Sequence, residues 1–280
     1  MEVLKGLTLY DERALYGSRD TEVEDTVFDG RMDGESALKE CRNIICRRCH
    51  FDMRYPLWHD VDVAVYDCEM TESCRAALWY SENIRIENSK LHGIKALREC
   101  RRAEVSASDI VSAEFGWMCE DVKLTNCRAK GEYFMFRSRN LSFDELLFEG
   151  KYSFQYVENA TFDNCKFDTK DAFWHAKHVV VKNSVIKGEY LAWYCEDVTF
   201  ENCVIIGTQP LCYCKGLKLI NCKMLECDLA FERSEVEAVV TSSVDSIKNP
   251  YKGYISTPSV GEIILDDPNA VCDIRIGEGL

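Results

Sequence analysis

The sequence repeats itself every 19 residues. Asp121, Asn140, Asn159, His178 and Asp197 follow one another at this interval, and apolar, cysteine and glycine positions recur around them. A fixed period of this length is typical of solenoid proteins, in which each repeat is one coil that buries its apolar face by stacking on its neighbours. We therefore expect equivalent residues of successive repeats to form columns along a stack.

Alternation of apolar and polar residues within the repeat predicts short β-strands. After residue 197, Val198 and Phe200 alternate with polar residues, which is typical of a strand with one buried face. Asn202 then marks a bend, because asparagine tolerates a left-handed backbone, and Ile205 anchors a second strand. The motif Leu191–Trp193 predicts a third strand.

Three short strands and three bends in each repeat predict a triangular coil. Each strand would pair with the same strand of the next coil, about 4.8 Å away. We therefore predict an all-β fold, a single-stranded right-handed parallel β-helix with about 11 to 12 coils. A leucine-rich-repeat horseshoe is the alternative, but its units are longer, at about 20–29 residues, and its asparagine stands further from the strand.

The chain is expected to form a single domain over residues 1–280. We predict regular coils in residues 37–243, an N-terminal cap and first coil in 1–36, and a C-terminal cap in 244–280. The repeat fades in the last segment, where Pro250, Pro258 and Pro268 gather. Caps are expected because an uncovered terminal coil would offer an edge for pairing with other chains.

The 16 cysteines fall mainly into two columns of the repeat. Cys203 and Cys222 belong to one column and Cys195 and Cys214 to the other, and serine or alanine fills the same positions in other coils. Exchange among these residues predicts a small, buried, weakly polar side chain. A disulfide framework is the alternative that the cysteine count alone would suggest.

No motif in the sequence predicts a cofactor or a metal. Metal binding through Cys46/Cys49 or Cys212/Cys214 is the alternative to buried structural cysteines, but no second pair stands at zinc-site spacing. Phosphate-binding and dinucleotide-binding fingerprints are missing as well. We therefore predict no cofactor and no metal.

The charge of the chain opposes some classes of partner. A net charge of −14 disfavours extended contact with nucleic acid or an anionic membrane. No apolar run approaches the ~20 residues of a membrane span, and the first residues do not resemble a secretory signal. We expect a cytoplasmic protein without nucleic-acid or membrane partners.

All five tryptophans fall in one column of the repeat, and the next column is rich in tyrosine and histidine. Lys39 and Arg98 share the tryptophan column, and unpaired charges do not occupy a dry core, so we expect both columns to face outward. Together they form what we call the aromatic ribbon. Its predicted ligand-binding residues are Trp117, Phe136, Arg137, Tyr156, Trp174, His175, Trp193, Tyr194 and Tyr213.

Three interpretations of the aromatic ribbon compete. The rings can form a packing ladder, in which each stacks on its neighbour one coil away. They can form an interface with a partner or a second copy, since Trp, Tyr and Arg dominate interface hot spots. They can also line a ligand site, most naturally for an oligosaccharide. We predict ligand binding, with carbohydrate as the expected ligand and self-association as the alternative.

The sequence offers three candidate catalytic residues in the aromatic ribbon. Arg137, Tyr156 and His175 stand on three successive coils, where the arginine could bind a carboxylate or phosphate and the other two could transfer protons. The spacing shows no pair of carboxylates of the kind that glycosidases use. A polysaccharide lyase or hydrolase therefore stays open as an alternative, without assigned catalytic residues.

Several segments resemble a mostly bacterial family of unknown function, known as domain of unknown function 3737. The resemblance covers essentially the whole chain and implies a pectin-lyase-like, right-handed parallel β-helix. It implies no activity, cofactor or catalytic residue. Pectate lyases bind calcium through clustered acids, and Arg137 has no such cluster in its columns. The segments that carry the resemblance are Phe173–Ala176, Gly188–Trp193, Ile206–Cys214 and Asp228–Glu232.

Overall fold

The computed structural model of the chain describes residues 1–30 and 35–277. The chain forms two compact units, Met1–Ser142 and Phe143–Leu280. Each unit is a stack of coils made of parallel strands joined by tight bends, and the described residues contain no helix. Residues 31–34 and 278–280, which fall in the two segments expected to form caps, lie outside the described residues. The single domain stays a prediction.

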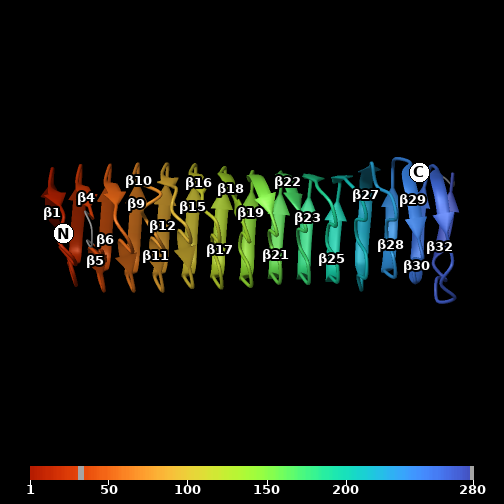
Figure 1. Cartoon of the computed structure of the whole chain (residues 1–280), viewed down its shortest axis with the longest axis horizontal. Coiled ribbons are helices and arrows are strands. Elements are labelled where there is room, and N and C mark those ends of the chain that lie inside the picture. The colour runs from red at the N-terminus through yellow and green to blue at the C-terminus, as the bar shows by residue number, and fades with distance from the viewer. Residues whose placement is uncertain (31–34, 278–280) are drawn as a thin grey trace. The chain divides into compact units, whose positions relative to one another are not determined.

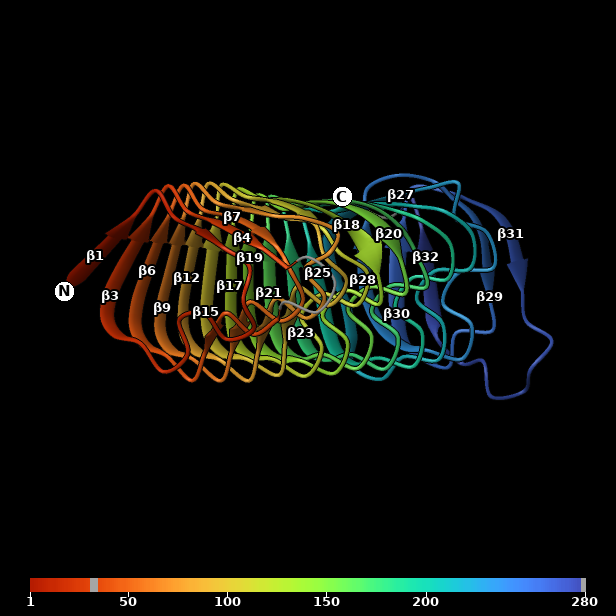
Figure 2. The ribbon, with the colours of Figure 1, turned by 60° about the vertical axis from the view of Figure 1, so that its left-hand side comes forward.

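In the first unit, two long rows of strands run along the stack (Figures 1 and 2). The first row comprises β1 (Glu2–Lys5), β3 (Arg19–Glu24), β6 (Arg42–Arg47), β9 (Val61–Tyr66), β12 (Glu82–Glu87), β15 (Arg101–Ser106), β17 (Glu120–Thr125) and the first four residues of β19 (Arg139–Asp144). The second comprises β2 (Thr8–Leu9), β4 (Val27–Asp29), β7 (His50–Asp52), β10 (Glu69–Met70), β13 (Lys90–Leu91), β16 (Asp109–Val111) and β18 (Arg128–Glu132).

The second unit repeats the same arrangement. One row comprises β21 (Glu158–Asp163), β23 (Lys177–Lys182), β25 (Glu196–Glu201), β27 (Leu217–Leu225), β28 (Glu235–Val240), β30 (Lys252–Thr257) and β32 (Asp273–Ile276). The other comprises β20 (Leu147–Lys151), β22 (Lys166–Lys170), β24 (Val185–Lys187) and β26 (Val204–Ile206), and β29 (Val244–Lys248) pairs with β31 (Val260–Ile264). Strand β27 bends and pairs in both rows.

Equivalent residues of successive coils lie directly opposite each other, as the 19-residue period predicts. Val179 of β23 pairs with Val198 of β25, and Ile186 of β24 pairs with Ile205 of β26, all in parallel register. Parallel strands joined by crossovers are almost always right-handed, and the fold is a right-handed parallel β-helix. The sequence-based prediction of the fold is confirmed.

The number of coils is larger than expected. The chain makes about 14 turns, whereas the sequence predicted 11 to 12. The difference arises because strands continue into the terminal segments that we expected to form caps. Strand β1 already pairs with β3, and β30 with β32. Sequence similarity fades in these coils, but the backbone pairing does not.

The bends depend on residues in the left-handed backbone region. Asn183 and Asn202 have φ of 49° and 53°, and their side chains form a ladder across coils. Nδ2 of Asn202 donates to Oδ1 of Asn183 at 3.4 Å, and Nδ2 of Asn221 donates to Oδ1 of Asn202 at 2.8 Å. The asparagine column thus stabilises one corner of the coil, as predicted.

The third strand differs from the prediction. Among the described residues, the short third strands of the first unit are β5 (Leu38–Lys39), β8 (Leu57–Trp58), β11 (Leu78–Trp79) and β14 (Leu97–Arg98). In the second unit, Ile247 of β29 forms a parallel bridge with Ala230, which stands at the third-strand position. In the second unit, the motif Leu191–Trp193 is a turn instead. Ala192 adopts φ of 56°, which reverses the usual alternation of strand side chains. For this reason Leu191 and Ala192 are both buried.

The cysteine columns are buried, and their thiols form hydrogen bonds with the backbone as the serines at the same positions of other coils do. Sγ of Cys68 accepts from the backbone N–H of Cys49 at 3.3 Å. In an equivalent coil, the backbone N–H of Cys165 donates to Oγ of Ser184 at 3.0 Å. A thiol or hydroxyl therefore satisfies backbone groups at a buried bend, which explains the exchange of cysteine and serine.

Candidate ligand-binding site

In the first unit, the tryptophan column is a continuous stack. The indoles of Trp58 and Trp79 lie 5.4 Å apart, with planes inclined by 9°. Lys39 Nζ lies 4.0 Å from the ring centre of Trp58, and the guanidinium of Arg98 lies 5.4 Å from Trp79 and 5.6 Å from Trp117. The cations in this column are thus held by cation–π contacts between coils.

In the second unit, the indoles of Trp174 and Trp193 are fixed by stacking and by hydrogen bonds. Nε1 of Trp174 donates to the carbonyl of Tyr190, and Nε1 of Trp193 donates to that of Gln209, both at 2.7 Å. Each indole therefore turns its N–H toward the backbone of the next coil. The two indoles stack on each other face to face, so the packing-ladder interpretation applies to this pair.

Beside these indoles lies a column that we call the Tyr–His ladder, composed of Tyr156, His175, Tyr194 and Tyr213. Its successive ring centres are 4.8, 5.1 and 4.8 Å apart, with planes inclined by 14°, 9° and 12°. Tyr156 and Tyr194 are 44% and 46% exposed. Because the faces are stacked, the ladder presents ring edges and polar atoms to solvent.

The end of the Tyr–His ladder at Tyr213 is tied into a charged network. Its hydroxyl donates to Oε2 of Glu232 at 3.1 Å, and Oε1 of Glu232 lies 3.1 Å from Nζ of Lys248. Burial and the nearby Glu232 carboxylate raise the pKa of Tyr213 to about 12. This hydroxyl is therefore protonated and already engaged at neutral pH.

The middle of the Tyr–His ladder keeps its hydrogen-bonding groups available. Within the described residues, neither the ring nitrogens of His175 nor the hydroxyl of Tyr194 has a hydrogen-bond partner or an acidic neighbour in ion-pair contact. His175 is half-buried between two tyrosine rings. These atoms can donate to or accept from a ligand that lies along the ring edges.

The structure brings six of the nine predicted ligand-binding residues together within the second unit. They are Tyr156, Trp174, His175, Trp193, Tyr194 and Tyr213. The other three lie in the first unit, where the rings of Trp117 and Phe136 are 5.2 Å apart and the guanidinium of Arg137 lies 5.3 Å from the Phe136 ring centre. Of the catalytic candidates, Tyr156 and His175 are stacked on each other, and Arg137 belongs to the first unit.

Sequence reasoning missed a third aromatic column, three residues before the tryptophans. In the second unit, Tyr190 packs edge-on against Trp193 with ring centres 5.4 Å apart, and Nζ of Lys170 lies 5.2 Å from the Tyr190 ring centre. Tyr133 packs edge-on in the same way against Phe136, three residues later in the first unit, at 6.2 Å. The multiples of 19 that separate these tyrosines were the signal that could have revealed the column.

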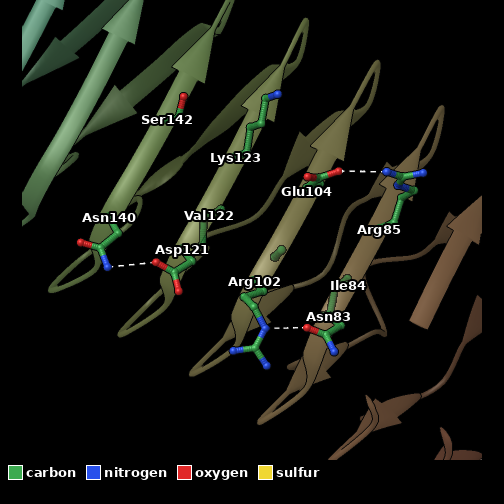
Figure 3. A pocket seen from close by; sticks show the side chains of 11 residues that line it. Asn83, Ile84, Arg85, Arg102, Glu104, Asp121, Val122, Lys123, Asn140 and Ser142 are labelled. Carbon is green, nitrogen blue, oxygen red and sulfur yellow. Dashed lines mark hydrogen bonds and ion pairs between the residues drawn. The ribbon is translucent and has the colours of Figure 1, made fainter. Parts of the chain in front are cut away.

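A second feature that the sequence did not reveal is a shallow trough of about 550 Å³ in the first unit. It lies on the outer face of β12, β15, β17 and the first residues of β19 (Figure 3). The alternate residues Ile84 and Val122 point into the core, so the exposed side chains of the strands form two rows with backbone between them.

The fold defines a right-handed parallel β-helix protein with a surface of stacked aromatic side chains. The chain belongs to the family described as "Protein of unknown function (DUF3737)", whose model matches residues 2–276. The resemblance found in the sequence is thereby confirmed. The comparison with curated proteins found no match.

Solved β-helix structures resemble the chain at low identity. The surface adhesin PfbA of Streptococcus pneumoniae is 9% identical, with a TM-score of 0.42, over 80% of this chain and 72% of that chain. The mannuronan C-5 epimerase AlgE4 A-module of Azotobacter vinelandii is 9% identical, with a TM-score of 0.39, over 98% and 88%. DFA-IIIase from Arthrobacter chlorophenolicus A6 is 8% identical, with a TM-score of 0.43, over 99% and 89%.

Proposed function

We propose that the protein binds an extended carbohydrate along the Tyr–His ladder of the second unit. The observation that carries the proposal is the row of stacked rings at 4.8–5.1 Å, whose edges face solvent and whose His175 nitrogens and Tyr194 hydroxyl are not engaged by the protein. Each rung offers an apolar ring edge beside a polar atom. A sugar chain presents the matching alternation of C–H and O–H groups along its length.

Rigidity supports binding by this surface. A ligand that meets flexible side chains must order them, at a cost of about 0.5–1.5 kcal/mol for each one. The rings of the Tyr–His ladder are already held by their neighbours one coil away, and the adjoining Trp174 and Trp193 are fixed by hydrogen bonds to backbone carbonyls. Most of this ordering is therefore complete before the ligand arrives.

The test is a titration of neutral and acidic hexasaccharides, followed by tryptophan fluorescence and calorimetry. Tyr194→Phe keeps the ring and removes one hydroxyl, so we expect about fivefold weaker binding from the loss of one hydrogen bond. His175→Phe keeps the stack and removes both nitrogens, and should weaken binding further. Tyr254→Phe, on β30 outside the ladder, is the matched control and should bind normally.

The alternative function is self-association through the aromatic ribbon. Tyr80 and Met118, in the ribbon of the first unit, are 45% and 43% exposed, as expected of a contact surface. Sedimentation velocity distinguishes the two functions. A stable dimer that Tyr80→Ser dissociates, together with no response to any hexasaccharide, would replace the carbohydrate proposal with the interface.

We further propose that the protein resides in the cytoplasm. The support comes from its 16 cysteines, which are all free thiols, because reduced cysteines persist in that compartment. Fractionation of cells that carry a tagged copy tests this location. Recovery of the protein in a secreted or periplasmic fraction would contradict it.

A further inference from the structure

The trough of the first unit is lined by two rows of polar side chains, one at the corner of the coil and one along the strands. The corner row lies where the backbone is left-handed, with φ of 56° at Asn83 and 57° at Asp121. This conformation turns the corner side chains away from the strand row and leaves the hollow between them. The two rows are Asn83, Arg102, Asp121 and Asn140, and Arg85, Glu104, Lys123 and Ser142 (Figure 3).

Most of these side chains are held by neighbours along the stack. Three such contacts join side chains of adjacent strands. They are Arg85 Nη2 with Glu104 Oε2 at 3.2 Å, Arg102 Nε donating to Asn83 Oδ1 at 2.6 Å, and Asn140 Nδ2 donating to Asp121 Oδ1 at 2.9 Å (Figure 3). The walls of the trough are therefore ordered and nearly neutral.

Lys123 is the exception. It lies opposite Glu104 in the parallel register of β15 and β17, yet Glu104 is paired with Arg85 on its other side. Within the described residues, the Lys123 ammonium has no hydrogen bond or ion pair. An anionic group that enters the trough therefore meets one cation that no protein carboxylate already neutralises.

Asp121, two residues before Lys123 on the same strand, supplies a complementary acceptor. Its Oδ1 accepts from Asn140 Nδ2, and its Oδ2 has no hydrogen bond or ion pair among the described residues. A free carboxylate oxygen accepts a hydrogen bond from a hydroxyl but repels an anion. The ligand that fits both residues carries an anionic group beside hydroxyl groups.

We propose that this trough binds an anionic sugar, with its carboxylate or sulfate on Lys123 and a neighbouring hydroxyl on Asp121. An open hollow between two rows of polar side chains suits such a ligand better than an apolar small molecule, which would need enclosure. The trough uses residues other than those of the Tyr–His ladder, so binding here is independent of the function proposed above.

Three hexasaccharides with one backbone test the proposal by calorimetry at low salt. They are β-1,4-linked hexaglucuronate, sulfated cellohexaose and neutral cellohexaose. Lys123→Met should weaken binding of the anionic probes at least tenfold, and Lys123→Arg should restore most of it. Lys166→Met is the matched control, because Lys166 is an exposed lysine on β22 that is likewise unpaired among the described residues. It should leave binding unchanged.

The outcomes are distinct. Preference for hexaglucuronate or for the sulfated probe supports the trough and identifies its anion as carboxylate or sulfate. Equal binding of all three probes, unchanged binding by Lys123→Met, or no binding of either anion to the folded wild-type protein overturns it. His175→Phe should retain Lys123-dependent binding, so a failure of the Tyr–His ladder and a failure of the trough are told apart.

Discussion

The indole rings of Trp174 and Trp193 lie parallel, one coil apart, with ring centres 5.3 Å apart and planes inclined by 2°. This pair links the sequence period to the surface of the fold, because residues 19 apart stack only when successive coils are in register. Trp193 also donates from Nε1 to the carbonyl of Gln209. The indole pair is therefore stabilised both by stacking and by a hydrogen bond.

We expect Trp193→Phe to lower the free energy of unfolding by about 1 kcal/mol, because it keeps a ring in the stack but loses the hydrogen bond. Trp193→Ala should cost about 3 kcal/mol, since it removes the stacking surface as well. Urea unfolding followed by far-UV circular dichroism measures both values. Equal losses for the two variants would mean that stacking contributes nothing.

Asp60 occupies a cysteine and serine position of the coil and is fully buried. Its Oδ1 accepts from the backbone N–H of Cys41 at 2.7 Å, while Oδ2 has no partner among the described residues. Burial, together with the negative charge of Glu40, raises the pKa of Asp60 to about 8. The carboxyl is therefore neutral in the folded chain over a range in which the unfolded chain ionises it.

We expect the free energy of unfolding to fall as the pH rises from about 4 to about 8. In this range the folded chain binds the Asp60 proton and the unfolded chain does not, so the slope approaches about −1.4 kcal/mol per pH unit. Asp60→Ser should remove this slope, because serine is neutral and fits the column. Urea unfolding at successive pH values measures this slope. Asp62→Ser is the control, because Asp62 is exposed. Identical pH profiles for the wild type and Asp60→Ser would refute the assignment.

Whether a feature of this protein could be predicted from its sequence depends on the physical cause of that feature. The coil, the asparagine corner and the cysteine columns could be predicted, because each depends on one residue type repeating at 19 residues. The turn that replaces the third strand could not, since φ of 60° at Phe173 is set by packing and not by a residue that favours a left-handed backbone. The trough and the orphaned Oδ2 of Asp60 depend on which atoms meet across coils, which spacing does not specify.

The burial of the cysteines predicts slow thiol chemistry. Burial raises the pKa of Cys41 and Cys212 to about 12, and the thiolate is the reactive form. We expect a thiol reagent to modify the folded protein slowly, with the half-buried Cys272 first. Peptide mapping over time identifies the order. Rapid labelling of Cys41 or Cys212 in the folded state would show that these coils open.

The hydrogen bonds of the cysteine column predict which substitutions of Cys203 are tolerated. Its Sγ donates to the carbonyls of Val181 and Glu201, both at 3.3 Å. Cys203→Ser keeps a donor and should change stability by less than about 1 kcal/mol, whereas Cys203→Val removes it and should cost about 1–3 kcal/mol. Thermal and urea unfolding compare them. If the valine variant were as stable as the serine variant, the size of the side chain and not its hydrogen bond would determine which residues this column tolerates.

Gly188 closes β24 at a point where neighbouring coils approach too closely for a side chain. Its φ is 154°, and a Cβ there would lie 1.3 Å from the carbonyl oxygen of Thr169 in the preceding coil. Its N–H donates to the carbonyl of Ile206 in the following coil at 2.8 Å. The backbone cannot retreat from one neighbour without disturbing its bond to the other. Gly188→Ala should therefore cost about 3 kcal/mol or more, or prevent folding.

Gly17→Ala is the control, because Gly17 also has a left-handed φ of 70° but nothing within 4 Å of its Cβ position. It should cost only about 1 kcal/mol, the penalty of the backbone conformation itself. Urea unfolding of both variants separates steric exclusion between coils from local strain, and equal losses would rule out the steric explanation.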